Sequence, residues 1–379
     1  MSYLTNNAKY VPTGIRKLIY LNWPVIALIC AVSAAGFLML YSVAGGSASP
    51  WMEPQVKRFA LGMVLMIGVG MVPIWFWRNM AGLAFGVSVI LLLAVEFFGS
   101  VGMGAQRWID LGFIRLQPSE LTKITLVMFL AAYYDWLPTN KTSHPLWVAL
   151  PVVIIVFPTA LVLGQPDLGT ALLLLFGGAT VMFIAGVHWA YFATVFAVGV
   201  GTIFAVMQSR GTAWQLLKDY QYRRIDTFLD PANDPLGAGY HITQAKIALG
   251  SGGVTGRGYM QGTQSSLDFL PEKHTDFIFT TLAEEFGFIG AVGLLTLYML
   301  IIVFCVASAM TNKDRFSALL TMGIAMTFFL FFAVNIAMVT GLAPVVGVPL
   351  PLVSYGGSAM LVLLVAFGLV QSAHVHKPR

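Results

Sequence analysis

The feature that most constrains this chain is a series of long apolar stretches that are nearly free of charge. Many run for 17 residues or more, the length that a helix needs to cross a hydrocarbon core of roughly 30 Å. Backbone amides and carbonyls cannot stay unpaired in lipid, so we expect each stretch to be a membrane-spanning helix. The ten stretches cover residues 24–43, 58–77, 80–99, 119–134, 147–163, 168–187, 189–208, 276–306, 315–340 and 352–372.

Composition argues against a soluble fold. Hydrophobic residues make up 58% of the 379 residues and charged residues only 10%, against about 25% charged residues in a typical soluble domain. Such a chain has too little polar surface to cover a globular core of this size. We find neither a separate soluble domain nor an internal repeat. The sequence therefore predicts an all-α integral membrane protein, one polytopic domain over 1–379 with about ten transmembrane helices.

The remaining bulk properties exclude other classes of site. The net charge of +5 comes without a basic run or an aromatic RNA-binding pattern, so we expect no nucleic acid partner. Cys30 and Cys305 lie inside apolar stretches and lack metal-ligand spacing, which argues against a disulfide or a metal site. The first apolar stretch has no small-residue cleavage site behind it, and we interpret it as a retained span.

The distribution of Lys and Arg predicts the orientation. Placing both termini in the cytoplasm puts nine of the 21 Lys and Arg residues inside, and seven of the other twelve fall in one long loop, 209–275. Long loops cross the membrane largely regardless of charge, so the short loops decide, and they favour this orientation. The long loop between the seventh and eighth helices is then on the outer side. Within it, Ile242, Ala245 and Leu249 share one face of a helix over 240–249 that could lie on the membrane surface.

The first candidate functional stretch is at the start of the fourth helix. Pro118 and Ser119 are typical of a helix start, and Glu120 and Lys123 share a face because they are three residues apart. Ionisable residues in a membrane span are expensive to bury and usually functional. Two readings remain open here, a local ion pair that satisfies both charges or a Lys123 that faces a cavity and binds an anion such as a phosphate.

The second candidate stretch opens the eighth helix. Asp276 follows Lys273, His274 and Thr275 at the outer helix end, where the positive end of the helix dipole stabilises a carboxylate. A helix cap alone would explain this position. Glu284 is eight residues further on and roughly on the same face, and two acids on one face beside a His and a Lys exceed what capping requires. We therefore keep Asp276 as a functional candidate with Glu284 in support.

The third candidate is the proline-rich turn before the last helix, over 344–358. Such turns between helices are usually structural. However, Ser354, Tyr355, Gly356 and Gly357 permit close approach of the backbone, and free N–H groups at a helix start can bind an anion. All three places lie on the outer side with Trp108. The expected site has one carboxylate, Asp276, among the cations Arg107, Lys123, Arg223, Arg224, Lys246 and Lys273, which suits an enzyme or transporter that handles a lipid phosphate.

Several motifs across almost the whole chain resemble the SEDS family (shape, elongation, division and sporulation proteins). The matching stretches are GAQRWIDLGFIRLQPSELTK at 104–123, QPDLGTA at 165–171, FLDPANDPLGAGYHITQAKIALGSGG at 228–253, GTQSSLDFLPEKHTDFIFTTLAEEFG at 262–287 and NIAMVTGLAPVVGVPLPLVSYGGS at 335–358. Within the family, the runs around LPEKHTDF and VPLPLVSYGGS resemble the RodA branch rather than the division paralogue FtsW.

The resemblance implies an activity. Family members polymerise lipid II, an undecaprenyl-pyrophosphate-linked disaccharide-pentapeptide, into β-1,4 glycan strands outside the bacterial inner membrane. Asp276 matches the family's essential aspartate, the proposed general base on the acceptor 4-hydroxyl. Lys123, Arg223 and Arg224 would stabilise the leaving pyrophosphate, and Trp108 would pack on sugar or lipid.

The resemblance also implies a partner, a class B penicillin-binding protein that crosslinks the strands. The sequence leaves open whether a divalent cation bridges the pyrophosphate, and no other cofactor is expected. Two alternative functions remain, a lipid II flippase and a non-enzymatic scaffold of the elongation machinery. A flippase should show two-fold internal repetition, which this sequence lacks, and a scaffold leaves Lys123 and the Asp276 cluster unexplained.

Overall fold

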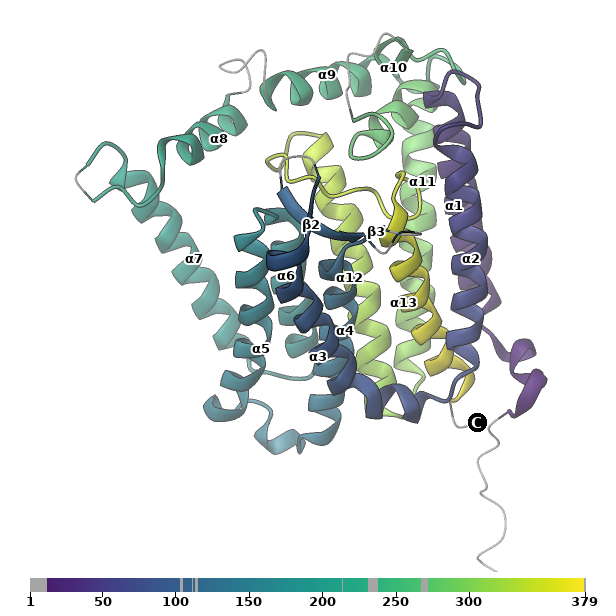
Figure 1. Ribbon diagram of the computed structural model, residues 1–379, viewed down its shortest axis with the longest axis vertical. Coiled ribbons are helices and arrows are strands. Elements are labelled where there is room, and N and C mark those ends of the chain that lie inside the picture. Colours follow the sequence, from purple (N-terminus) through teal and green to yellow (C-terminus); the bar gives the residue numbers. More distant parts are fainter. Residues whose placement is uncertain are drawn as a thin grey trace, which may run out of the picture.

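The fold is a bundle of long helices, seen in a computed structural model that describes residues 12–102, 105–110, 112, 115–212, 214–230, 238–266 and 272–377 (Figure 1). Ten long helices stand at the ten apolar stretches within this part of the chain. They are α1 (Trp23–Val43), α2 (Met52–Met71), α3 (Ile74–Phe98), α4 (Pro118–Trp136), α5 (Pro145–Gly164), α6 (Leu168–Ile184), α7 (Trp189–Ser209), α11 (Ile278–Met310), α12 (Arg315–Val339) and α13 (Gly357–Val375).

The all-α membrane fold is confirmed, whereas the number of spans stays a prediction. Seven of these helices are long and apolar enough to cross a membrane, namely α1, α3, α5, α7, α11, α12 and α13. The helix α6 is apolar but has only 17 residues. Charged residues lower the hydropathy of α2 and α4. Because α4 lies inside the bundle, its charges face protein rather than lipid, which is the usual arrangement for ionisable groups at membrane depth.

The helices alternate in direction, which gives the bundle two distinct ends. The loop end carries the connection after α7, the segment between α3 and α4, and the turn between α12 and α13. The terminal end carries the 3₁₀ helix η1 (Gly14–Tyr20), the start of α1 and the C-terminal end of α13 (Figure 1). In the interior, α4 and α12 each pack against α6, while α2 packs along α13 and α3 along α4. Close packing is possible where glycines face a neighbour, as Gly36 does against the backbone of Val353.

The last helix begins later than expected. We predicted a start at residue 352, but α13 begins at Gly357, and residues 344–356 form a turn at the loop end. The backbone at Leu352 lies outside the right-handed helical region that a helix starting at residue 352 would require, which accounts for the difference. Leu352 has a positive φ of 66° within this turn.

A small antiparallel sheet at the loop end was not foreseen. The strands β1 (Ser100–Gly102), β2 (Ala105–Asp110) and β3 (Arg115–Leu116) form it in the order β1-β2-β3. Ser100 pairs with Trp108 and Ile109 with Leu116. The sheet connects α3 to α4 at the loop end (Figure 1), and its strand β2 contains Arg107 and Trp108.

The long loop contains short helices, as expected, and leads from α7 back to α11. These are α8 (Asp219–Leu229), α9 (Ala238–Ser251) and α10 (Thr263–Ser266). Ile242 and Ala245 of α9 are buried and α9 packs against α11 and α12, so this helix is docked on the bundle rather than lying freely on a membrane surface. The helix α7 stands apart from the bundle over much of its length (Figure 1), and its only buried residue is Ser209.

The helix α11 is broken near its loop end, and a segment of the long loop fills the break. Gly287 has a φ of 66° inside α11. The amides of Arg257 and Gly258 donate to the carbonyls of Glu284 and Glu285 over 3.0 Å each. On the other side of the break, the amides of Phe288 and Ile289 donate to loop carbonyls. The loop therefore supplies the backbone hydrogen bonds that the broken helix lacks.

Candidate active site

A cavity of about 280 Å³ opens at the loop end between the sheet, α4, α6, the start of α11 and the α12–α13 turn. Four carboxylates line it, Glu120, Asp167, Glu272 and Asp276. The cations Arg107 and Lys123 line it too, together with Trp108, Gln117, Tyr355, Gly356 and Gly357. The structure thus brings residues from five separate segments of the chain to one site.

The backbone around Asp276 is fixed by hydrogen bonds to three consecutive carbonyl oxygens. The carbonyl of His274 accepts from the amide of Tyr355 over 2.9 Å, and that of Thr275 accepts from the hydroxyl of Ser354 over 2.6 Å. The carbonyl of Asp276 accepts from the side-chain amide of Asn335 over 2.9 Å. The α12–α13 turn and α12 therefore hold the base of the cavity in register with the start of α11.

Asn335 is the central member of this arrangement. Its side chain is fully buried, and the same Nδ2 also donates to the carbonyl of Val348 over 2.7 Å. One amide group thus joins α12, the segment before α11 and the α12–α13 turn. Our sequence analysis missed Asn335, although a polar side chain in the middle of an apolar stretch is a signal that could have identified it.

The electrostatic environment of Asp276 differs from the expected one. We expected the helix dipole, Lys273 and His274 to favour the ionised form. Instead, burial first, and then the neighbouring Glu272 and Asp167 carboxylates, raise the pKa of Asp276 from 3.8 to about 6. Asp276 precedes the helix N-cap, Phe277, so it is not itself the cap of this helix. A carboxylate with a pKa near 6 is better matched to proton transfer near neutral pH than an ordinary aspartate.

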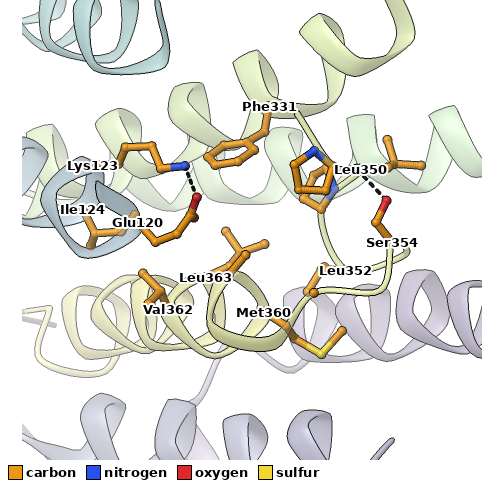
Figure 2. A pocket seen from close by; sticks show the side chains of 14 residues that line it. Glu120, Lys123, Ile124, Phe331, Leu350, Leu352, Ser354, Met360, Val362 and Leu363 are labelled. Carbon is orange, nitrogen blue, oxygen red and sulfur yellow. Dashed lines mark hydrogen bonds and ion pairs between the residues drawn. The ribbon is translucent and has the colours of Figure 1, made fainter. Parts of the chain in front are cut away.

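Glu120 and Lys123 form a buried ion pair on the first turn of α4, with Nζ 2.7 Å from Oε1 and side chains only 9% and 2% exposed. The ammonium also lies 3.9 Å from the centre of the Phe331 ring. Figure 2 shows Lys123 pointing to Glu120 with Phe331 beside it. The expected local pair therefore exists and both residues line the cavity, whereas anion binding by Lys123 stays a prediction.

Behind this pair lies a smaller chamber of about 30 Å³, enough room for a water molecule. Apart from Glu120, Lys123 and Ser354, its walls are apolar or glycine and come from α4, α12, α13 and the turn before α13 (Figure 2). Six residues line both spaces, among them Glu120, Lys123 and Phe331. The ion pair therefore stands where a polar cavity meets an apolar interior.

Arg107 and Asp167 connect the sheet to the start of α6. The guanidinium of Arg107 donates to the carbonyl of Gln165 over 3.0 Å and also to that of Pro166. Asp167 caps α6 by accepting from the amide and hydroxyl of Thr170 over 3.1 and 2.9 Å. Sequence analysis did not select Asp167 individually. An acid directly before an apolar stretch, as in QPDLGTA, was the available signal.

The turn before α13 is held from the side of α2. Gln55, which is fully buried, donates to the carbonyl of Ser354 over 2.9 Å and accepts from the amide of Gly356 over 3.3 Å. The Ser354 hydroxyl also accepts from the amide of Leu350. Because the Ser354 hydroxyl and the Gly356 amide are both engaged within the protein, they position the site rather than offer free groups to an anion. Tyr355 and Gly357 remain on the cavity wall.

His274 is sandwiched beside the cavity rather than directed into it. Its ring stacks on Trp51 with centroids 4.6 Å apart and lies 6.1 Å from the ring of Tyr355. Burial lowers the pKa of His274, which favours the neutral ring. His274 and Lys273 are not among the described residues that line the cavity.

Three further predicted residues lie away from the cavity. Arg223 is exposed on α8, and Lys246 packs its side chain against Gly341 after α12. Glu284 does not share the face of Asp276. Its carboxylate accepts from the amides of Thr263 and Gln264 over 2.7 and 3.0 Å, so it holds the long loop. The side chain of Arg224 lies outside the described residues.

The described residues do not provide a cluster of metal ligands. Within these ranges, no group of three or more His, Cys, Asp or Glu side chains could hold a metal ion. The acids of the cavity have other partners, since Glu120 pairs with Lys123 and Glu272 accepts from the hydroxyl of Thr275 over 2.8 Å.

Comparison with known proteins gives matches over nearly the whole chain. The FtsW/RodA/SpoVE family model, described as a cell cycle protein, matches residues 18–379. The peptidoglycan glycosyltransferase MrdB of Escherichia coli strain K12 is 40% identical over 361 residues, 95% of each chain. The peptidoglycan glycosyltransferase RodA of Treponema pallidum is 31% identical over 434 residues, which cover 96% of this chain and 99% of that one.

Solved structures share the fold. A chain from work on the structural coordination of polymerization and crosslinking by a peptidoglycan synthase complex has a TM-score of 0.81 and 32% identity, over 93% of this chain and 97% of that one. The crystal structure of the Thermus thermophilus rod shape determining protein RodA has a TM-score of 0.70 and 28% identity, over 95% and 98% of the two chains.

Proposed function

We propose that the cavity at the loop end is the glycosyl-transfer site. This chain belongs to the FtsW/RodA/SpoVE family of cell cycle proteins, and the proposal starts from that membership. The protein is a multi-pass membrane enzyme, a peptidoglycan glycosyltransferase of cell elongation, as its relatives MrdB and RodA are named. Asp276 is the observation that carries the assignment of the site. It is a carboxylate with a pKa near 6 in a cavity that two cations also line.

In the proposed reaction, the Asp276 carboxylate accepts the proton of the acceptor sugar 4-hydroxyl. The oxygen then bonds to the anomeric carbon of the donor sugar, and the bond from that carbon to the pyrophosphate oxygen breaks. The pyrophosphate leaves with the bonding electrons and needs no proton at that moment. A positioned base contributes roughly 10²–10⁴-fold to such a rate, and fixed cations stabilise the departing charge.

Lys123 and Arg107 are the cations that we assign to the pyrophosphate. Both line the cavity, and Arg107 is held in place by two carbonyl oxygens. We do not retain Arg223 in this role, because it is exposed on α8 and does not line the cavity. Trp108, half-buried on β2 at the cavity wall, would pack on sugar.

The substrate that fits this site is lipid II, with polar sugars, two phosphates and an isoprenoid tail. The cavity carries both acids and cations on its wall, which suits the sugar hydroxyls and the phosphates. Release of Glu120 from Lys123 as the phosphates arrive would free the ammonium for the substrate. A class B penicillin-binding protein is the expected partner, because the chain similar to this one at a TM-score of 0.81 comes from a synthase complex that couples polymerization to crosslinking.

The proposed location is the bacterial inner membrane, with both termini in the cytoplasm and the active face in the periplasm. The charge of the terminal end supports this orientation. In the described part of the chain, this end carries seven cations, Arg16, Lys17, Arg78, Lys141, Lys313, Arg315 and Lys377, against two acids, Asp135 and Asp314. An excess of Lys and Arg in short loops is typical of the cytoplasmic side.

The test is polymerisation of labelled lipid II by the purified protein in detergent. Asp276→Asn removes the basicity with little change in shape and leaves the backbone hydrogen bonds of residues 274–276 in place. We expect this variant to insert into membranes and bind lipid II but to make no glycan. Near-parental polymerisation by Asp276→Asn would show that the base lies elsewhere. Asp276→Glu should also be impaired, because a displacement of about one ångström can cost roughly a hundredfold in rate.

A further inference from the structure

A second cavity lies at the terminal end, on the opposite side of the bundle from Asp276. It measures about 330 Å³ and is bounded by the residues before and within η1, the α2–α3 turn and the residue that follows α13. The volume is in the range of small-ligand sites. None of the groups assigned to glycosyl transfer lines this cavity, so it is separate from the glycosyl-transfer site.

The polar groups of this cavity suit a ligand that carries an anion and a hydroxyl. Lys17, Thr13 and His376 line it, and its eight described lining residues include no carboxylate. The Lys17 ammonium donates one hydrogen to the carbonyl of Met71 over 2.8 Å, which leaves two for a ligand. His376 is buried with its Nδ1 2.9 Å from the carbonyl of Ser372, and its Nε2 has no hydrogen-bond partner.

The protonation of His376 defines what its free nitrogen can do. Burial is the main cause that lowers the pKa of His376, and the charge of Lys17 lowers it further. The ring is therefore neutral at physiological pH. With Nδ1–H directed to Ser372, the neutral Nε2 is an acceptor, which matches a hydroxyl group rather than a second phosphate oxygen.

The surface around the cavity is apolar, as expected of a segment at the membrane interface. Ile15 and Ile19 on η1 are 81% and 74% exposed, and the Trp75 side chain at the cavity wall is 58% exposed. Trp23 nearby at the start of α1 is 51% exposed. Tryptophans at helix ends mark the membrane interface, and a basic segment with exposed isoleucines is typical of a segment that lies in it. Arg16 and Lys17 give this segment its positive charge.

We propose that this cavity binds an anionic phospholipid with a hydroxylated headgroup, such as phosphatidylglycerol. Lys17 holds the lipid phosphate, His376 accepts a hydrogen bond from a headgroup hydroxyl, and the acyl chains lie against Ile15, Ile19 and Trp75. The bound lipid would connect the N-terminal segment to the α2–α3 turn and to the end of α13. A soluble phosphate shares the headgroup chemistry but makes no use of the exposed isoleucines.

The test is native mass spectrometry of the full chain, delipidated in detergent and titrated with phosphatidylglycerol or phosphatidylethanolamine of equal chain length. We expect retention of phosphatidylglycerol over phosphatidylethanolamine. Lys17→Gln, which can still donate to the Met71 carbonyl, should weaken phosphatidylglycerol binding roughly tenfold, the effect of losing one charge-assisted hydrogen bond. Lys17→Arg should preserve binding, and Lys57→Gln, which removes an exposed cation at the loop end, should have no effect.

Two further experiments distinguish a lipid phosphate from a free phosphate and test the role of His376. Soluble glycerol phosphate in excess should not displace the bound lipid, and displacement would assign the site to a free phosphate instead. His376→Phe should abolish the preference for phosphatidylglycerol over phosphatidic acid, which has no headgroup hydroxyl beyond its phosphate. Equal retention of the two titrated lipids by the parent protein, or unchanged retention in Lys17→Gln, would overturn the proposal. Both readouts are independent of polymerisation.

Discussion

At the scale of single residues, the raised pKa of Asp276 has a direct kinetic consequence. The base is active only when ionised, and burial with Glu272 and Asp167 places its pKa near 6. We expect the polymerisation rate to fall as pH drops through 6, with about a tenth of the base ionised at pH 5. An aspartate of ordinary pKa would keep its rate to near pH 4, so a profile that is flat from pH 7 to 5 would contradict the assignment.

The raised pKa of Asp276 makes its contribution to the stability of the folded protein depend on pH in the opposite direction from the polymerisation rate. The folded state raises the pKa of Asp276, so it binds its proton more tightly than the unfolded chain does. Its contribution to stability is therefore present at low pH and is lost as pH rises through 6. Thermal unfolding measured over the same pH range would separate titration of the base from acid denaturation, because this group does not destabilise the protein where the rate falls.

Lys123 allows the structural and chemical roles of an ion pair to be separated. Lys123→Met removes the cation and strands a buried Glu120 carboxylate, and breaking a buried pair in this way costs about 3–5 kcal/mol unless the acid becomes protonated. The double variant Lys123→Met/Glu120→Gln removes the stranded charge. We expect polymerisation to be lost in both, whereas thermal stability should recover in the double variant. Recovery of polymerisation together with stability would show that the pair is only structural.

Asn335 is expected to position the base. Asn335→Leu keeps the size but removes the donor to the Asp276 and Val348 carbonyls. Asn312→Leu is a matched control, since the Asn312 amide donates to the carbonyl of Ala373 over 3.0 Å at the terminal end. Both should lose roughly 1–3 kcal/mol of stability through unpaired carbonyls. Only Asn335→Leu should lower the turnover rate, and an equal effect of both variants on turnover would remove the positioning role.

At the scale of elements, the break in α11 is the feature on which the long loop depends. The loop enters the break so closely that a Cβ on Gly256 would lie 2.1 Å from the carbonyl oxygen of Glu285, and its φ is 83°. We expect Gly256→Ala to lower stability by at least about 1–3 kcal/mol. Gly250→Ala, on the same loop but with open space around it, should leave thermal unfolding in detergent unchanged. Equal melting temperatures for the two variants would contradict the docking of the loop in the break.

At the scale of the whole molecule, the orientation in the membrane can be tested by cysteine labelling in intact spheroplasts. Gly262 is an unsuitable probe, because it is buried and a Cβ there would lie 2.9 Å from Oε2 of Glu284. Gln261→Cys at the loop end and Lys313→Cys at the terminal end are both exposed positions. A membrane-impermeant thiol reagent should label Gln261→Cys only. Labelling of Lys313→Cys alone would reverse the orientation and move the active face to the cytoplasm.

The sequence by itself determined the helices and the family. Lipid offers no hydrogen bonds to the backbone, so each long apolar stretch had to become a helix. A long helix overlaps each of the ten stretches, although α2 begins six residues before its stretch and α13 begins five residues after the start of its own. The motif around Asp276 could also be identified from the sequence, because charged residues are costly at membrane depth and stand out in an apolar chain. The sheet at Ser100–Leu116 could not be predicted, since its strands are too short to show a pattern.

Only the tertiary structure decided which polar groups share a cavity. Asp167 and Asn335 lie far from Asp276 in the sequence. Nevertheless, the Asp167 carboxylate raises the pKa of Asp276, and the Asn335 side chain donates a hydrogen bond to the Asp276 carbonyl. Glu284 was placed at the site because a continuous helix would put it on the face of Asp276, whereas Arg223 and Lys246 were placed there because they lie on the same side of the membrane. That reasoning fails because a side of the membrane is a wide surface, whereas Coulomb interactions and hydrogen bonds act over a few ångströms. Packing of α4, α12 and the turn before α13 sets those distances, and no local pattern in the chain records them.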